Sequence, residues 1–410
     1  MTPDLFDISF ALTIYFVLVY RYKQLNKSLF INPISTGLLV FAISIASVNY
    51  FYRIGNMNDK EYFILMFQFL IYFIFIFVTP YFIKKKYFNL SEYMNISNFD
   101  IQVTKIIFYI SLVIGIVYIS LLWMNYSDGS ERFIFNRNMR ELMLFNTLFS
   151  IWALYMSSLI YSKTKKKTFL YYAFILIVLS AFMGSRGAAM QGFLIFLFFY
   201  LQCNKIKKEY FILLIIIFTC LVILPTQFMY GNALEMILNR VFLSADIYLW
   251  SFVVGDYKPF IDFYDPLKYI LHPFSSLIGI RGYEYNFGAQ ILETANRVVD
   301  GRGPNDQMPM LGMIFYNDCL LCISVFIIIF SLIMMFTIVF VFYLFSKTNI
   351  DLSLRVLVFS LLYYSSINIF IGVNAFSFNI VILLLGFVVY FIFYIFKKIG
   401  SKKALNNDEK

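Results

Sequence analysis

Long apolar segments recur along the whole chain, and they restrict the possible folds more than any other feature. A helix needs about 20 mostly apolar residues to cross roughly 30 Å of hydrocarbon. Such segments recur throughout the 410 residues, of which 61% are hydrophobic. The sequence therefore predicts an all-α polytopic integral membrane protein, with one transmembrane domain over 1–410 and about 11 transmembrane helices. The expected spans lie near 6–22, 34–52, 62–83, 104–124, 142–162, 168–185, 187–203, 210–229, 318–345, 353–371 and 375–396.

The lysine residues are concentrated in short clusters between the apolar segments. Clusters such as 84–86, 163–167 and 205–208 follow every second segment. Loops rich in basic residues stay on the cytosolic side of a membrane. We therefore expect the N-terminus outside, the C-terminus in the cytoplasm, and the lipid bilayer as a partner. These clusters also account for the formal net charge of +10, so that charge does not indicate a nucleic acid partner.

Arginine is distributed differently from lysine. With this topology the cytosolic side holds 19 of the 22 Lys but 2 of the 11 Arg. A guanidinium group binds phosphate through two parallel hydrogen bonds, whereas an ammonium group acts as a point charge. The outward arginines therefore favour an anionic ligand, although salt bridges to outward acidic residues would also explain any one of them. They are Arg53, Arg132, Arg137, Arg140, Arg186, Arg240, Arg281, Arg297 and Arg302.

Arg186 lies between two apolar runs, in the sequence Gly184-Ser185-Arg186-Gly187. A single helix over 168–203 would be about 54 Å long, which is far more than the bilayer thickness. The sequence therefore predicts a tight outer hairpin that holds Arg186 at the external membrane boundary. The alternative is that Arg186 is only an interfacial anchor.

One long outer (periplasmic) loop with short helices is expected over 230–311. Residues 233–253 have the spacing of an amphipathic helix. The Asp265-Pro266 pair provides an N-cap and a first-turn proline for another helix, and Pro273 disfavours helix at His272. His272 is the single histidine of the chain. It is either a proton-transfer group or a surface imidazole.

Cys319 and Cys322 form one CxxC pair with no second pair and no nearby histidine. Buried thiols are therefore expected there instead of a zinc site or a disulfide. The chain has no P-loop, no Gly-rich dinucleotide motif and no recognisable Ser-His-Asp set. ATP-driven transport and zinc-dependent hydrolysis are thus disfavoured. An arginine-rich outward surface beside the bilayer suits an anionic substrate carried by a lipid.

In its order of features the chain resembles the Wzy-type O-antigen (oligosaccharide repeat unit) polymerases. The matching motifs are Glu131-Arg132 before the fifth span, the Gly184 to Gly187 turn, and Pro304 through Tyr316 at the entry to the ninth span. The resemblance covers nearly the whole chain in topology. The chain departs from the family in two respects: the Arg-x10-Gly spacing of some members is absent, and Asn317-Asp318 stands where members often have Gly.

The resemblance implies a metal-independent glycosyltransferase without a cofactor, in the bacterial cytoplasmic (inner) membrane. Its substrate would be an undecaprenyl-diphosphate-linked oligosaccharide, and a chain-length regulator protein is a further partner that the resemblance leaves open. We expect arginines to bind the diphosphates and one carboxylate or imidazole to act as the base. The candidate diphosphate-binding residues are Arg186, Arg281 and Arg302, with Arg132 and Arg240 in reserve; the candidate bases are His272, Glu284 and Asp306.

Three other functions remain as alternatives. A flippase or transporter of the same lipid-linked oligosaccharide would usually show internal repeats and charged residues at mid-membrane, and the sequence shows neither feature. An O-antigen ligase would transfer the glycan to lipid A core, and sequence alone separates it poorly from a polymerase. A sugar acyltransferase would modify the glycan without changing its length.

Overall fold

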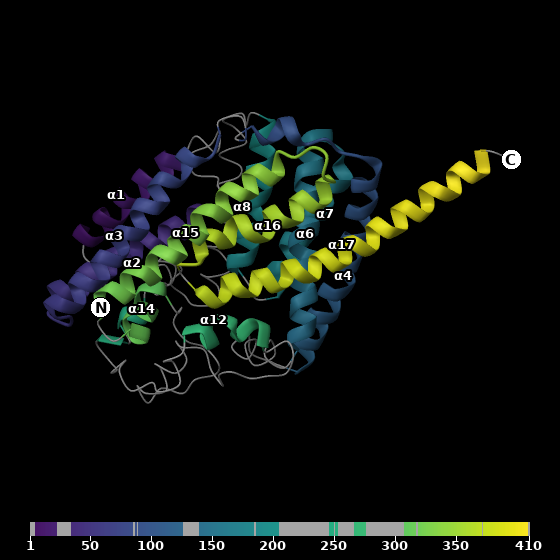
Figure 1. Cartoon of the computed structure of the whole chain (residues 1–410). Coiled ribbons are helices and arrows are strands. Elements are labelled where there is room, and N and C mark those ends of the chain that lie inside the picture. The colour runs from purple at the N-terminus through teal and green to yellow at the C-terminus, as the bar shows by residue number, and fades with distance from the viewer. Residues whose placement is uncertain are drawn as a thin grey trace.

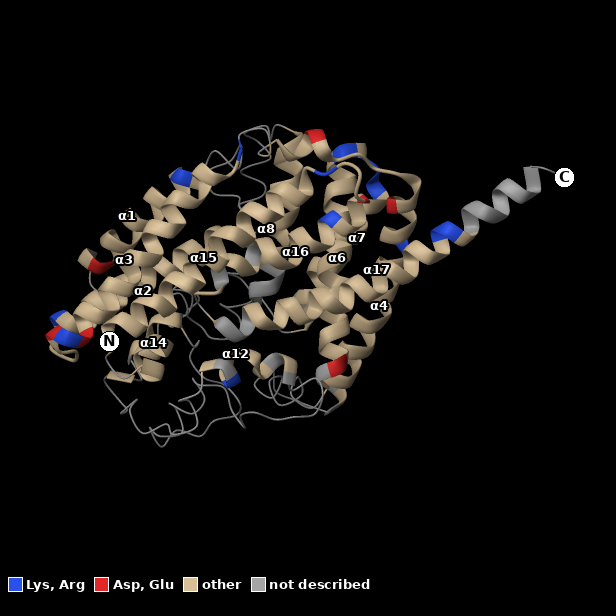
Figure 2. Cartoon of the chain, viewed as in Figure 1, with Lys and Arg blue, Asp and Glu red and all other residues tan. Residues whose placement is uncertain are grey.

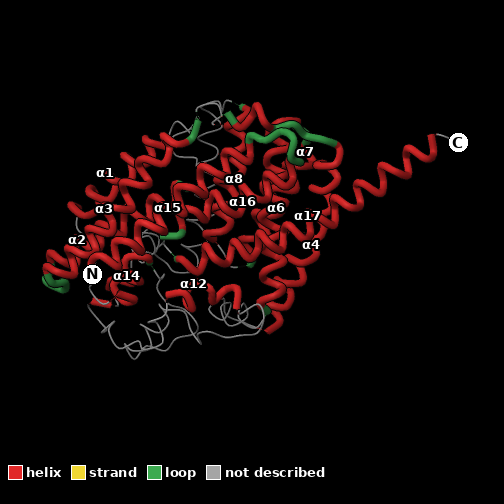
Figure 3. Tube along the Cα trace, viewed as in Figure 1, coloured by secondary structure: helices red, strands yellow, loops and turns green. Residues whose placement is uncertain are grey.

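The computed structural model consists of helices and their connections, with no strand among the described residues (Figures 1 and 3). The described residues are 5–22, 34–84, 87, 89–125, 139–183, 186–204, 246–249, 251–252, 266–275, 307–316, 319–370 and 372–408. The helices are α1 (Leu5–Tyr22), α2 (Ser35–Arg53), α3 (Asp59–Phe82), η3 (Leu90–Tyr93), α4 (Asn98–Asn125), α6 (Arg140–Thr164), α7 (Lys167–Phe182), α8 (Arg186–Cys203), α11 (Asp246–Leu249), α12 (Pro266–Ser275), α14 (Met308–Tyr316), α15 (Leu320–Phe345), α16 (Leu352–Asn368) and α17 (Val373–Asp408).

The predicted spans coincide with these helices, except that 210–229 lies outside the described residues. Within the described ranges, six helices are long and apolar enough to cross a membrane: α2, α3, α4, α6, α15 and α17. Shorter apolar stretches lie in α7, α8 and α16. The structure is therefore that of a polytopic helical membrane protein, and the count of eleven spans stays a prediction.

The outside of the bundle carries large apolar side chains. Phe63 on α3, Val113 on α4, Phe336 on α15 and Phe391 on α17 are between 58% and 62% exposed. Such a surface would be unfavourable in water and is stable against lipid tails. In contrast, α6 is central, since it packs against α4, α7, α8, α16 and α17.

Described basic residues gather at one end of the bundle, at the top of Figure 2. Lys163 Nζ donates to the carbonyl of Ser91 at 3.0 Å, and Lys397 pairs with Asp351 at 3.1 Å. These contacts join the end of α6 to η3, and α17 to the start of α16. We call this end of the bundle, defined by Lys163, Asp351 and Lys397, the basic end. Segment ends that were predicted to be cytosolic therefore lie together.

Buried Arg355 fixes the helices at the basic end. It donates to the carbonyls of Tyr93 and Ile350 at 3.0 Å each, and also to that of Phe345. Asp100 contributes by accepting from the backbone N–H of Ser353 at 3.0 Å. Since a buried carbonyl needs a donor, one side chain thereby links η3, the end of α15 and the start of α16.

At the opposite end of the bundle, α1, α2 and α3 meet. Arg53 pairs with the buried carboxylate of Asp7 at 2.6 Å, so the salt-bridge explanation holds for this outward arginine. Asn58 and Glu61 form a reciprocal capping box at the start of α3, which satisfies backbone donors that the helix cannot pair.

The predicted hairpin around Arg186 is present as two helices. α7 ends at Phe182, α8 begins at Arg186, and the two helices pack against each other. Gly192 explains the close approach of α8, because a Cβ there would lie 3.0 Å from Leu154 Cδ2 and 3.2 Å from Ile177 Cγ1.

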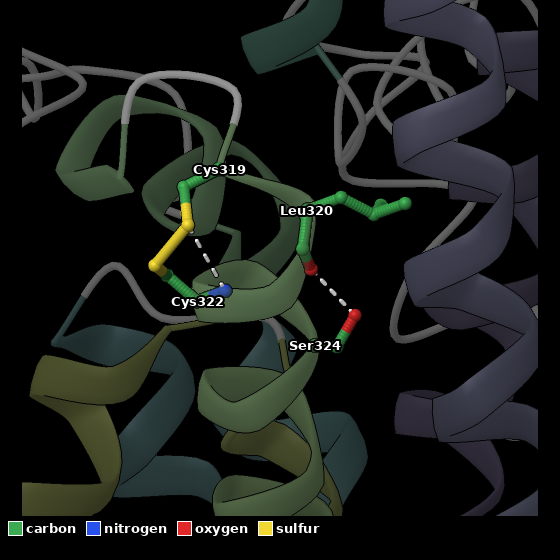
Figure 4. The surroundings of a disulfide bond; sticks show 4 residues. All are labelled: Cys319, Leu320, Cys322 and Ser324. Carbon is green, nitrogen blue, oxygen red and sulfur yellow. Dashed lines mark hydrogen bonds between the residues drawn. A yellow bond between two sulfur atoms is a disulfide. The ribbon is translucent and has the colours of Figure 1, made fainter.

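The prediction of buried thiols at Cys319 and Cys322 is wrong, because these residues form a disulfide (Figure 4). They lie at the start of α15, where the helical turn places their Cα atoms 5.3 Å apart, within the range that a disulfide bridges. Cys203 is a half-buried thiol.

Candidate functional site

Helix α14 lies inside the bundle, between α3 and α15. Every residue from Met308 to Phe315 is buried. Gly312 permits this position, because a Cβ there would lie 2.7 Å from Gln68 Oε1. Gln68, buried in α3, also donates from Nε2 to the carbonyl of Pro309 at 3.1 Å. A nine-residue helix is thus held within the bundle by an amide side chain of a spanning helix.

The start of α14 rests on a buried turn. α16 has 17 residues and is about 25 Å long, which is too short to cross the hydrocarbon alone. The turn to α17 includes Phe370, which is fully buried. Its carbonyl accepts from Met308 N at 2.9 Å. Non-helical backbone at membrane depth must be satisfied within the protein, and α14 supplies the donor.

The same turn is surrounded by aromatic rings of α2 and α3. The Phe370 ring lies 4.9 Å from that of Phe41 and 4.8 Å from that of Tyr72. Phe41 precedes the end of α2 at Arg53 by about 18 Å of helix. The α16–α17 turn therefore lies well inside the bundle, away from the end at which α1, α2 and α3 meet. α14 fills part of the space between the turn and that end.

Two further polar side chains complete this buried layer. Tyr248, on α11, donates its hydroxyl to Gln307 Oε1 at 2.8 Å, and both residues are fully buried. Burial raises the pKa of Tyr248 well above its usual value, so the hydroxyl keeps the proton that it donates. We call Gln68, Tyr248, Gln307 and Phe370 the polar layer.

The polar layer was missed by sequence reasoning, although it left one signal. Gln68 is a polar side chain in the middle of the apolar segment 62–83, where such groups need a partner. Gln307 lies next to predicted Asp306 in the sequence and five positions after predicted Arg302. The layer therefore anchors one end of the segment that carries these two candidates.

His272 lies on α12 and is half-buried. It occupies the last turn of this helix. The expectation that Pro273 ends the helix is wrong, because α12 continues to Ser275. α12 packs along α17, and the buried Tyr269 ring lies 5.7 Å from that of Phe315. This packing outweighs the preference of the residue before proline for a non-helical backbone.

The backbone of Arg186 begins α8, and its side chain lies outside the described residues. Neighbouring α6 runs parallel to α8, because their C-terminal ends meet: Asn204 Nδ2 donates to the Ser162 carbonyl at 3.1 Å. Arg140, which begins α6, therefore lies at the same end of the bundle as Arg186, opposite to the basic end. Two helix N-termini, with their free N–H groups, provide a favourable environment for an anion.

The predicted site residues outside the described ranges are Arg132, Arg240, Glu284, Arg281, Arg302 and Asp306. The predicted amphipathic helix over 233–253 is described only at α11 and at 251–252. Among the described residues, no group of three or more His, Cys, Asp and Glu side chains is placed to hold a metal ion.

Comparisons with known proteins do not identify the chain. No protein-family model matches it, and no curated protein or solved structure matches it either.

Proposed function

We propose that this chain is an O-antigen polymerase, a glycosyltransferase that joins undecaprenyl-diphosphate-linked repeat units on the outer face of the bacterial cytoplasmic membrane. In this proposal the chain crosses the membrane eleven times. The basic end faces the cytosol, as the positive-inside bias favours, and α11, α12 and α14 lie on the outer side.

The observation that carries the proposal is the anchoring of α14 on the buried α16–α17 turn. Gln307 joins this anchor through Tyr248, and the turn-rich segment with Arg302 and Asp306 leads directly into it. A mobile lipid-linked glycan needs a fixed frame, because catalysis depends on positioning of the reacting atoms. The N-termini of α6 and α8, with Arg140 and Arg186, lie at the same end of the bundle.

The proposed reaction displaces a diphosphate. A hydroxyl at the non-reducing end of the incoming unit attacks the anomeric carbon of the growing glycan. The bond from that carbon to the diphosphate oxygen breaks, and the diphosphate leaves with its lipid. His272, Glu284 or Asp306 accepts the hydroxyl proton. Arg186, Arg281 and Arg302 stabilise the negative charge that develops on the leaving group.

Substitution of Arg186 tests the proposal. Loss of a group that stabilises transition-state charge typically costs about 10²- to 10³-fold in rate, so Arg186→Ala should abolish long polymer on gels. Arg186→Lys should give short polymer, since an ammonium cannot bind two phosphate oxygens in the same way. Lys268→Ala, at an exposed position of α12, is the control and should leave polymer length unchanged. Full-length polymer from both Arg186 variants at normal protein level would remove Arg186 from the mechanism.

A deletion strain separates this function from its alternatives. Loss of a polymerase leaves surface core with a single repeat unit. Loss of a ligase leaves bare core and polymer on the carrier lipid, and loss of a transporter leaves repeat units on the cytosolic face. Either of the last two phenotypes would contradict the proposal.

A further inference from the structure

The Cys319–Cys322 disulfide lies at the opposite end of the bundle from the basic end. α15 begins directly after Cys319 and ends at Phe345, whose carbonyl is bound by Arg355 at the basic end. The 26 residues of α15 make about 39 Å of helix, which exceeds the thickness of the hydrocarbon. Cys203 lies at the basic end, next to Asn204 and its bond to Ser162. The Cys319–Cys322 disulfide and the Cys203 thiol thus lie at opposite ends of the bundle.

This disulfide does not hold distant parts of the fold together. It bridges residues that are three positions apart, within a turn already held by the bond from Ile323 N to the carbonyl of Cys319 at 3.0 Å. Ser324 Oγ adds a bond to the carbonyl of Leu320 at 2.6 Å. A disulfide stabilises least when the loop that it closes is short. A structural role therefore explains this bridge poorly.

The sulfur of Cys319 is suited to thiol–disulfide exchange. Cys319 is exposed and Cys322 is half-exposed, so a second protein can reach the bridge. The N–H of Cys322 donates to Cys319 Sγ at 3.3 Å (Figure 4). This donor and the N-terminus of α15 both favour negative charge on that sulfur, and the thiolate is the form that attacks or leaves in exchange.

We propose that Cys319–Cys322 is a redox site on the extracytoplasmic end of the protein, which exchanges with a dithiol–disulfide oxidoreductase. In the oxidising direction, the Cys319 thiolate attacks the disulfide of the partner and forms a mixed disulfide. The Cys322 thiolate then attacks Cys319 Sγ, which closes the bridge and releases the partner as a dithiol. Two electrons and two protons pass from the cysteine pair to the partner. The extracytoplasmic position of the pair rests on the proposed function. The thiol–disulfide exchange itself does not depend on glycosyl transfer.

Thiol labelling on spheroplasts tests location and redox state together. One full-length variant, Cys203→Ser/Cys220→Ser, keeps only the pair. Its matched control, Cys220→Ser/Cys319→Ser/Cys322→Ser, keeps only Cys203. The probes are a membrane-impermeant phosphine reductant and an impermeant maleimide of high mass, read as a gel shift. The first variant should shift only after the reductant, and the control only after permeabilisation, because disulfides persist outside the cytosol.

The other outcomes distinguish the two proposals. Labelling of the pair without reductant would show thiols on the outer side, which overturns the redox site and leaves the orientation intact. Labelling of the pair only after permeabilisation would place it in the cytosol, which overturns the orientation and the redox site together. Neither result depends on polymer formation, which the Arg186 variants report separately.

Glutathione disulfide identifies the exchanging sulfur. The two variants compared are Cys322→Ser and Cys319→Ser, each purified in the Cys203→Ser/Cys220→Ser background. Glutathione disulfide should modify Cys319 of the first severalfold faster than Cys322 of the second, as followed by intact mass. Equal rates, or faster modification of Cys322, would contradict the assignment of Cys319 as the exchanging sulfur.

Discussion

At the scale of single residues, a few buried hydrogen bonds hold α11 and α14 within the bundle. Tyr248 donates to Gln307, and Gln68 donates to the carbonyl of Pro309. A hydrogen bond contributes little net free energy when both partners could otherwise bond to water. Loss of one partner inside the bundle is costly, because the other is left buried and unpaired.

Tyr248→Phe should therefore destabilise the protein by about 1–3 kcal/mol, since Gln307 Oε1 loses the donated proton in a buried site. Thermal unfolding of the purified protein in detergent measures the effect. Tyr171→Phe is the control, because Tyr171 is 60% exposed, and it should leave the unfolding temperature nearly unchanged. Equal unfolding temperatures for the two variants would show that the hydroxyl of Tyr248 does not support α14.

Gly312→Ala should also destabilise the protein, by about 1–3 kcal/mol, because overpacking in a filled core forces side chains to shift. The new Cβ would lie 2.7 Å from Gln68 Oε1, and Gln68 would lose its bond to Pro309. Adding Gln68→Ala removes the clash, so the double variant should lose less stability than the sum of the two single variants. Strict additivity, measured by the same unfolding assay, would indicate that the two positions do not interact.

At the scale of the elements, Arg355 has more structural consequence than the surface ion pairs. Its guanidinium binds carbonyls contributed by η3, by the end of α15 and by the start of α16. The carbonyls of Tyr93 and Phe345 are at helix ends, where the backbone has no intrahelical partner, and that of Ile350 lies in the turn before α16. The geometry of the basic end thus depends on one side chain with several donors.

Arg355→Ala should lower stability by about 3 kcal/mol or more, because several carbonyls lose their donor at once. Arg355→Lys should recover part of that loss, since an ammonium lacks the planar fork of a guanidinium. Lys397→Ala is the comparison: its ion pair with Asp351 is partly exposed and should be worth about 0–1 kcal/mol. Protein yield and unfolding temperature rank the three variants, and the opposite order would contradict this description of the basic end.

At the scale of the whole molecule, the all-helical membrane fold and the approximate bounds of the described spanning helices followed from the sequence, because a bilayer fixes the length of an apolar segment. The polar layer did not follow. Gln68 and Pro309 are 241 positions apart, and only tertiary packing brings them together. The disulfide was misjudged because cysteine spacing alone does not reveal a helical turn at an exposed end. The arginine candidates of the outer loop stay predictions.

The orientation of the molecule can be measured with fusions. We expect alkaline phosphatase inserted between α2 and α3 to be active, because this turn lies at the end of the bundle opposite to the basic end and the enzyme folds only outside the cytosol. The same enzyme inserted between α6 and α7 should be inactive, and a fluorescent protein fused to the C-terminus should fluoresce. The reverse pattern would place the basic end outside.

The length of α17 has a mechanical consequence. It is one uninterrupted helix of 36 residues without proline, it packs against α12 near one end of the bundle, and Lys397 holds it to Asp351 at the other. Between these two attachments the helix has no proline and no adjacent Gly/Ser pair, which are the usual sites of kinks. A tilt imposed where α12 is attached should therefore be carried along one stiff lever to the Lys397–Asp351 pair, and through Asp351 to the start of α16.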